Sequence, residues 1–128
     1  MKTSLINAVI LAENYDKLVD WYIQTFTLDV EHKVEKDYHY TELAQNGHSV
    51  VGIAKTEEMG VTPTKPRNNS VIVQIMVSNI YELCDRIKAH GKVLFGPTRD
   101  KDEGFTYGGI ADPEGNQIWL VERKSKDK

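Results

Sequence analysis

The sequence predicts an α+β protein built from two successive βαβββ modules. Two segments with helical spacing of apolar residues begin at Tyr15 and Ile80. A strand-like run rich in isoleucine and valine precedes each segment, and three more strand-like runs follow it. The chain has 128 residues, the size of one ordinary domain. We therefore expect a single domain over residues 1–128, with one module at about 1–60 and the other at about 66–124.

The first module opens with a strand expected over Leu5–Ala12 and a helix expected over Tyr15–Phe26, with Asn14 as its N-cap. The helix prediction depends on four residues that recur at a spacing of three and four, namely Leu18, Trp21, Tyr22 and Thr25. Asn46-Gly47 is a strong signal for a tight turn between strands. The three strands expected after the helix are Leu28–Val34, Tyr38–Gln45 and Ser49–Lys55.

The second module repeats this order. We expect a strand over Ser70–Val77 and a helix over Ile80–Ala89, with Asn79 as its cap and Gly91 just past its end. The last two strands are joined by the turn Asp112-Pro113-Glu114-Gly115. The three strands expected after the helix are Lys92–Phe95, Phe105–Ala111 and Gln117–Arg123. Thr56–Asn69 is expected to link the modules and Lys124–Lys128 to be frayed.

Composition excludes several classes of partner. Sixteen lysines and arginines against nineteen aspartates and glutamates give a net charge of -3, so the chain lacks the basic excess of nucleic-acid-binding proteins. No apolar run approaches the ~20 residues that a membrane span needs. The single cysteine, Cys84, cannot form an internal disulfide. We therefore expect a cytoplasmic protein with no nucleic-acid or membrane partner.

The order of elements and two sequence stretches resemble a known family. The stretches are the first helix, Asn14–Tyr22, and the closing Asp-Pro-Glu-Gly-Asn turn followed by an apolar strand, residues 112–120. They are similar to the glyoxalase, bleomycin-resistance and extradiol-dioxygenase superfamily, also called the vicinal-oxygen-chelate superfamily. The resemblance implies two modules whose sheets form a curled sheet around a cleft, with the helices on the outside. It also implies a homodimer and a function located in the cleft.

Enzymes of this family usually hold one divalent metal with His or Glu from the first strand of each module and Glu from the last. The corresponding positions here are Asn7, Ile72, Trp119 and Val51, or Gly52 if the strand slips by one residue. None of these side chains is a histidine, cysteine or carboxylate, the ligands that borderline divalent metals need. The four histidines show no HxH or HExxH spacing. We therefore predict no metal and no cofactor.

Strand alternation gives the candidate ligand-binding residues, because every second side chain faces the same side of a sheet. A cleft lined mainly by apolar and aromatic groups with a few polar ones is typical of a small-molecule site. The candidates are Asn7, Tyr38, Tyr40, Glu42, Val51, Ile72, Gln74, Tyr107 and Trp119. Each is also compatible with a core or dimer contact. In particular, Trp119 either lines the cleft or fills it.

The favoured function is metal-free binding of a small organic molecule, similar to the bleomycin-resistance branch of the family. Bleomycin itself is not implied. The alternative is an enzyme: a lyase, isomerase or dioxygenase with displaced metal ligands, or a metal-free catalyst with Glu42 or Tyr107 as acid or base. A structural or regulatory dimer is a third reading. The sequence leaves open whether the protein is an enzyme, and it does not identify the ligand.

Overall fold

The computed structural model describes residues 1–60, 71–90 and 92–123, with no description of the His90 side chain. The chain divides into two compact units, Met1–Thr64 and Lys65–Lys128. Each unit has one four-stranded mixed sheet and one α-helix in the order βαβββ. The α+β prediction with two βαβββ modules is confirmed.

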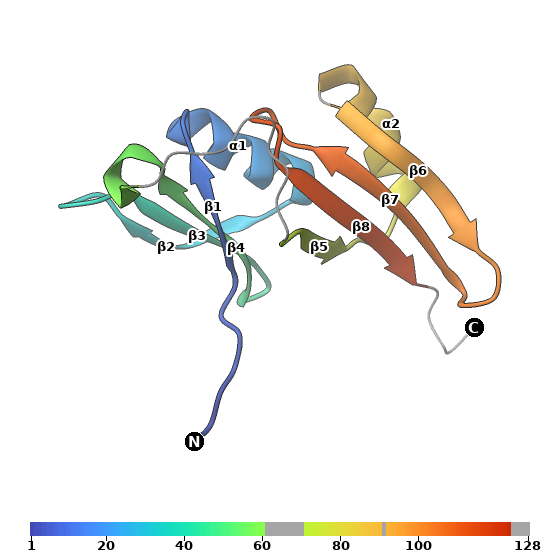
Figure 1. Ribbon diagram of the computed structural model, residues 1–128, viewed down its shortest axis with the longest axis horizontal. Coiled ribbons are helices and arrows are strands. Elements are labelled where there is room, and N and C mark those ends of the chain that lie inside the picture. Colours follow the sequence, from blue (N-terminus) through green and yellow to red (C-terminus); the bar gives the residue numbers. More distant parts are fainter. Residues whose placement is uncertain (61–70, 91, 124–128) are drawn as a thin grey trace. The chain divides into compact units, whose positions relative to one another are not determined.

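The first unit begins with an edge strand that pairs in parallel with the last strand of the unit. Its sheet has the order β1-β4-β3-β2, and the other two pairings are antiparallel. Figure 1 shows these strands with the helix beside them. The elements are β1 (Ala8–Ala12), α1 (Tyr15–Phe26), β2 (Asp29–Val34), β3 (Tyr40–Gln45), β4 (His48–Lys55) and the 3₁₀ helix η1 (Glu57–Met59).

The second unit has the same topology. Its sheet has the order β5-β8-β7-β6, in which β5 pairs in parallel with β8 and the other pairs are antiparallel. The elements are β5 (Val73–Met76), α2 (Ile80–His90), β6 (Lys92–Asp100), β7 (Phe105–Ala111) and β8 (Gln117–Arg123). No helix in the described part of the chain is long and apolar enough to cross a membrane.

Most expected bounds agree with the structure, and the larger differences lie at strand ends. β5 is Val73–Met76, shorter than the expected Ser70–Val77, of which Ser70 lies outside the described residues. The first helix and the last two strands are as expected, while β1 starts at Ala8 instead of Leu5. β3 starts at Tyr40, so Tyr38 lies in a bend before the strand. β6 continues past Phe95 to Asp100. Gly91, the linker from residue 61 onwards and the tail at 124–128 lie outside the described residues.

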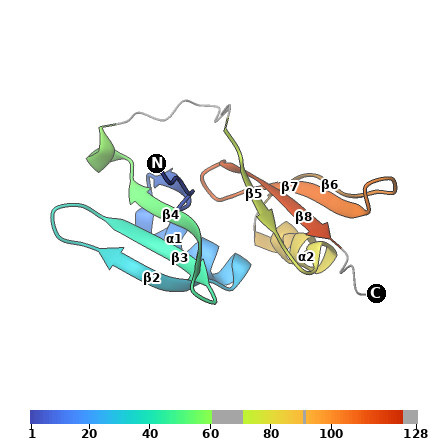
Figure 2. The ribbon, with the colours of Figure 1, turned by 90° about the horizontal axis from the view of Figure 1, so that it is seen from below.

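Each helix covers one face of its own sheet (Figure 2). Alternation along the strands therefore divides each sheet into a covered face and an open one. The buried side chains of the first unit include Ile10, Leu18, Tyr22, Thr41, Leu43, Val51 and Ile53. Those of the second include Ile80, Leu83, Cys84, Ile87, Ile110, Ile118 and Leu120. The hydrophobic contacts that hold each unit together lie between its helix and one side of its sheet.

The two helices start differently. Asn79 caps α2 with a side-chain oxygen that accepts from the Glu82 N–H at 3.2 Å, and its amide group donates to the Glu82 carboxylate. The Glu122 carboxylate on β8 also accepts from the Ile80 N–H at 2.6 Å, which ties α2 to the sheet. Asn14 is the N-cap residue of α1, but its side chain makes no capping hydrogen bond. Only the second cap prediction is confirmed at the level of the side chain.

A chain of polar contacts connects η1 to the start of β3. The Glu58 carboxylate accepts from the His39 backbone N–H at 2.7 Å and lies 2.8 Å from His39 Nδ1. The His39 ring meets Tyr15 edge-on, and the Tyr15 hydroxyl is hydrogen-bonded to buried Thr41. The hydrogen bond from His39 holds the pKa of the Glu58 carboxyl below its ordinary value. The ionised form of Glu58 therefore favours the folded state.

This contact predicts a loss of stability in acid. Because the folded-state pKa of Glu58 is lowered, its contribution is fully present above the unfolded pKa of about 4.3 and disappears as pH falls through the folded value. We expect Glu58→Gln to flatten the decline in unfolding free energy between about pH 5 and pH 3. Urea unfolding at several pH values measures this decline. Glu57→Gln, the neighbouring control, should retain the wild-type slope, and equal slopes for all three proteins would contradict the assignment.

The closing turn is organised by one buried carboxylate. Asp112 Oδ1 accepts from the N–H groups of Glu114 and Asn116, both at 2.9 Å, and Oδ2 accepts from the Asn116 side chain at 2.8 Å. Gly115 has a φ of 87°, which glycine adopts without strain. The Asp-Pro-Glu-Gly-Asn motif thus fixes the entry into β8.

We expect Asp112→Ala to lower the unfolding free energy by about 2–4 kcal/mol, since it leaves buried donors without an acceptor. Chemical denaturation monitored by circular dichroism measures the change. Asp102→Ala, an exposed aspartate in the β6–β7 loop, is the control and should stay within about 0.5 kcal/mol of wild type. A loss of similar size in both variants would argue against the special role of Asp112.

Candidate functional site

The open face of the first sheet carries a polar cluster, defined here as Asn7, Tyr40 and Ser49. The Asn7 side-chain nitrogen donates to the Ser49 hydroxyl at 2.9 Å and to the Tyr40 hydroxyl at 3.2 Å. All three side chains are partly buried. Glu42 lies two residues along β3 from Tyr40 and therefore on the same face. This face combines hydroxyl, amide and carboxylate groups from three neighbouring segments.

A β-bulge places Ser49 in this cluster. Leu43 pairs with Val51, but the next residue of β3, Ala44, pairs with Ser49, so Val50 is an extra residue in β4. In a regular strand, residues two apart point to the same side, so without this extra residue Ser49 would face the helix, as Val51 does. The bulge moves Ser49 to the open face, where it meets Asn7.

The Tyr40 ring lies across Gly52 on β4. A β carbon on Gly52 would lie 2.6 Å from the Tyr40 hydroxyl oxygen and 2.7 Å from a ring carbon, distances that real structures do not tolerate. A larger residue here would push the Tyr40 ring away, so glycine permits this close approach. The packing fixes the direction in which the Tyr40 hydroxyl points.

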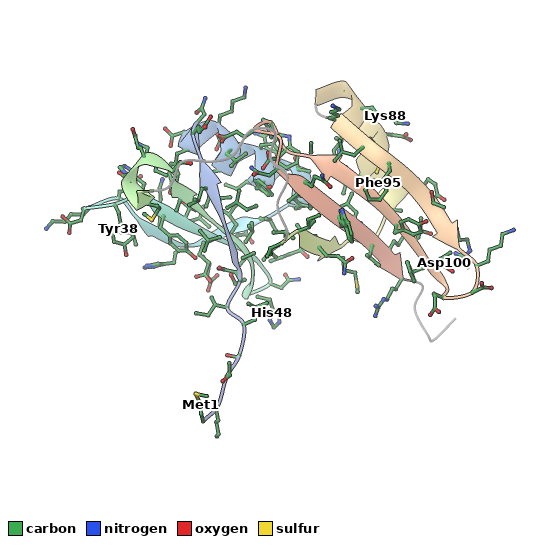
Figure 3. The ribbon with its side chains drawn as sticks, in the orientation of Figure 1. Met1, Tyr38, His48, Lys88, Phe95 and Asp100 are labelled. Atoms are coloured by element: carbon green, nitrogen blue, oxygen red, sulfur yellow. The ribbon has the colours of Figure 1, made fainter. Side chains whose placement is uncertain are left out.

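The open face of the second sheet carries a row of four residues in register, one from each strand, which we call the aromatic row because it includes the exposed rings of Trp119 and Phe95. In register, Gln74 pairs with Trp119, Trp119 with Gly109, and Gly109 with Phe95. Trp119 is 42% exposed and Phe95 is 40% exposed, and their rings meet edge-on with centroids 6.2 Å apart. Figure 3 shows Phe95 on the second sheet. Tyr107, two residues before Gly109, extends this face.

Gly109 holds the Phe95 ring in place, because a β carbon there would overlap that ring. We expect Gly109→Ala to displace Phe95 from Trp119, to change the near-ultraviolet circular dichroism, and to lower stability by about 1–3 kcal/mol. The double variant Gly109→Ala/Phe95→Ala removes the overlap and serves as a control. It should show no further loss of stability relative to Phe95→Ala, and an additive loss would show that another contact is responsible.

The nine predicted site residues do not all face the same way. Val51 is fully buried on the helix-covered face of its sheet, and Gly52 takes the open position, so the expected register was wrong by one residue there. Tyr38 is 45% exposed in the β2–β3 bend and belongs to no strand. Ile72 is half-buried just before β5. The other six lie on open faces: Asn7, Tyr40 and Glu42 in the first unit, and Gln74, Tyr107 and Trp119 in the second.

Sequence reasoning missed Ser49 and Phe95. No sequence pattern marks the bulge that turns Ser49 outward, because it arises from strand pairing. Phe95 was expected to end its strand. The glycine in the middle of β7 was the available signal, since such a glycine often lies under an aromatic ring from a neighbouring strand.

The residues at the expected metal positions do not fit a metal ion. The Asn7 side-chain nitrogen is engaged with two hydroxyls, and Trp119 presents an indole. Ile72 and Gly52 offer no side-chain donor atom, and buried Val51 offers none either. Within residues 1–60, 71–90 and 92–123, no three His, Cys, Asp or Glu side chains are grouped as a metal site would require. Cys84 is buried in α2, and burial raises the pKa of its thiol, which disfavours a nucleophilic role.

Comparison with known proteins agrees with this architecture. A "Probable lactoylglutathione lyase" from Vibrio cholerae is 27% identical over 128 residues, covering 94% of this chain and 91% of that protein. The fold also matches TnmS3, an antibiotic binding protein from Streptomyces sp. CB03234, with a TM-score of 0.69, 15% identity and coverage of 96% and 98%. A fosfomycin resistance protein, FosX, from Listeria monocytogenes matches with a TM-score of 0.72, 12% identity and coverage of 99% and 98%.

A family model decides the assignment. The Glyoxalase/Bleomycin resistance protein/Dioxygenase superfamily model matches residues 5–120, which is nearly the whole chain. The resemblance inferred from the first helix and the closing turn is therefore confirmed. The chain belongs to the Glyoxalase/Bleomycin resistance protein/Dioxygenase superfamily.

Proposed function

We propose that this protein binds a small planar organic molecule on the open face of its second sheet, without a metal ion. The observation that carries the proposal is the exposed indole of Trp119, which lies beside Phe95 at the position where family enzymes usually have a metal-binding glutamate. Exposed aromatic rings on a fixed strand supply large apolar contact area with little loss of side-chain entropy.

The neighbours of Trp119 suit a ligand with an apolar body and a polar edge. Phe95 presents its ring at a right angle to the indole, so one ring can stack on a flat ligand while the other meets its edge. Gln74, directly beside Trp119 in register, is exposed and offers both an amide donor and an acceptor. The binding energy would come from apolar burial and stacking, with Gln74 setting the orientation.

Two relatives support a binding role by analogy. TnmS3 is described as an antibiotic binding protein, which is the direct analogy; FosX is described as a fosfomycin resistance protein, which associates the fold with a small-molecule antibiotic and does not itself state binding. Both share the fold with this chain at low identity, so they support the class of function and leave the ligand open.

The alternative is a metal-dependent lyase, isomerase or dioxygenase with non-standard ligands. The observation that favours it is the 27% identity to a protein named as a probable lactoylglutathione lyase. The side chains at the expected metal positions oppose it, because none is a carboxylate or imidazole. The test of the proposed function therefore also measures whether added divalent metals bind to the protein.

Fluorescence of Trp119 tests the proposal directly. The chain has two tryptophans, so Trp21→Phe leaves Trp119 as the only one. With 2-naphthol as the probe, in buffer containing EDTA, we expect saturable quenching of Trp119 emission. Trp119→Ala should weaken binding of the probe about tenfold, measured by calorimetry. Tyr81→Ala removes an exposed aromatic ring from α2, where no contact with the probe is expected, and should leave the affinity unchanged.

Absence of saturable quenching, or equal affinity in Trp119→Ala and the control, would contradict binding at this face. To measure metal binding, Zn²⁺, Ni²⁺, Mn²⁺ and Fe²⁺ are added to EDTA-stripped protein during thermal unfolding. A stoichiometric metal that raises the melting temperature and is required for probe binding would replace the proposal with the enzyme alternative.

A further inference from the structure

We propose a second binding site, on the open face of the first sheet, that recognises a neutral amide group. It consists of the polar cluster (Asn7, Tyr40 and Ser49) together with Glu42. The site is defined within the first unit and does not depend on the aromatic row.

The hydrogen bonds within the cluster leave each hydroxyl with a hydrogen still to donate. The Asn7 side-chain nitrogen carries two hydrogens and donates one to each hydroxyl, at 3.2 Å and 2.9 Å. Each hydroxyl oxygen therefore acts as an acceptor and still has its own hydrogen to donate. Neither hydroxyl has another hydrogen-bond partner among the described residues. A carbonyl oxygen of a ligand is the complement of this arrangement.

The same contacts hold the donors in fixed positions before a ligand arrives. The Tyr40 ring is confined by its packing on Gly52, and the bulge at Val50 turns Ser49 to the same face. The shared amide of Asn7 then sets the distance between the two hydroxyls. Donors fixed in this way lose little conformational entropy when a ligand binds.

Glu42 selects a neutral carbonyl over an anion. It pairs in register with Gly52, the residue under the Tyr40 ring, and lies on the same face as Tyr40. A carboxylate at this position repels carboxylate and phosphate ligands, and it accepts a hydrogen bond from an N–H group. An amide satisfies both requirements, because its C=O accepts from the hydroxyls and its N–H donates to Glu42.

Nitrogen-15 NMR titration with N-methylacetamide, with acetate as a charged probe of similar size, tests the proposal. We expect N-methylacetamide to produce saturable shifts of the Asn7 side-chain amide and of the backbone amides of Ser49 and Gly52, with a dissociation constant in the millimolar range. Acetate should bind at least about tenfold more weakly. Tyr40→Phe and Ser49→Ala should each weaken binding of N-methylacetamide by about threefold to tenfold.

Tyr81→Phe is the matched control, since it removes the same hydroxyl from an exposed tyrosine on α2, outside the cluster, and it should leave the affinity unchanged. Glu42→Gln keeps the shape and removes the charge, so it should reduce the discrimination against acetate. The proposal would be overturned if the NMR shifts did not saturate with N-methylacetamide, or if acetate bound equally well. Wild-type affinity in both Tyr40→Phe and Ser49→Ala would also overturn it. None of these measurements involves Trp119, so a negative result for the amide site says nothing about ligand binding at the aromatic row.

Discussion

One helix covers only one face of a four-stranded sheet, and the rest of the structure follows from this constraint. In each unit the helix-facing side chains form the hydrophobic core, as Leu43 and Val51 do in the first unit. Because successive strand residues point to opposite sides, their neighbours Glu42 and Gly52 must lie on the open face. The core therefore decides which residues are available for binding, and a slip of one residue would exchange the two sets.

Both open faces use the same device to place an aromatic ring. Tyr40 lies across Gly52, and Phe95 lies across Gly109, each glycine standing on the neighbouring strand. Glycine weakens a strand interior, because it has no side chain to pack and loses more backbone entropy on folding. The aromatic ring packs over the glycine in place of the missing side chain, and this contact fixes the position of the ring. Placement of these rings thus depends on glycines that neither sheet requires for its own pairing.

The sequence was sufficient for the elements and insufficient for some of the side-chain directions. Helix α1 and strands β7 and β8 were predicted to the residue, because helical spacing and turn residues are local signals. The directions of Asn7, Tyr40 and Glu42 followed from alternation counted along each strand. Val51 and Ser49 could not be assigned in this way, since the bulge in β4 depends on pairing with β3 and has no local signature. Strand β6 was expected to end at Phe95, but it continues through Gly96-Pro97 to Asp100, since an edge strand tolerates proline.

The residues at the positions of the family's metal ligands change the chemistry that the fold can perform. A metal ion concentrates positive charge at one point and needs deprotonated ligands, so its binding is linked to pH. The amide of Asn7 and the indole of Trp119 have no proton that titrates near neutral pH, and both are already engaged with neighbouring side chains. Recognition by such groups depends on directed hydrogen bonds and on stacking. With no carboxylate or imidazole at these positions, the two open faces suit selection of a ligand by shape, by hydrogen-bonding pattern and, on the first sheet, by the charge of Glu42.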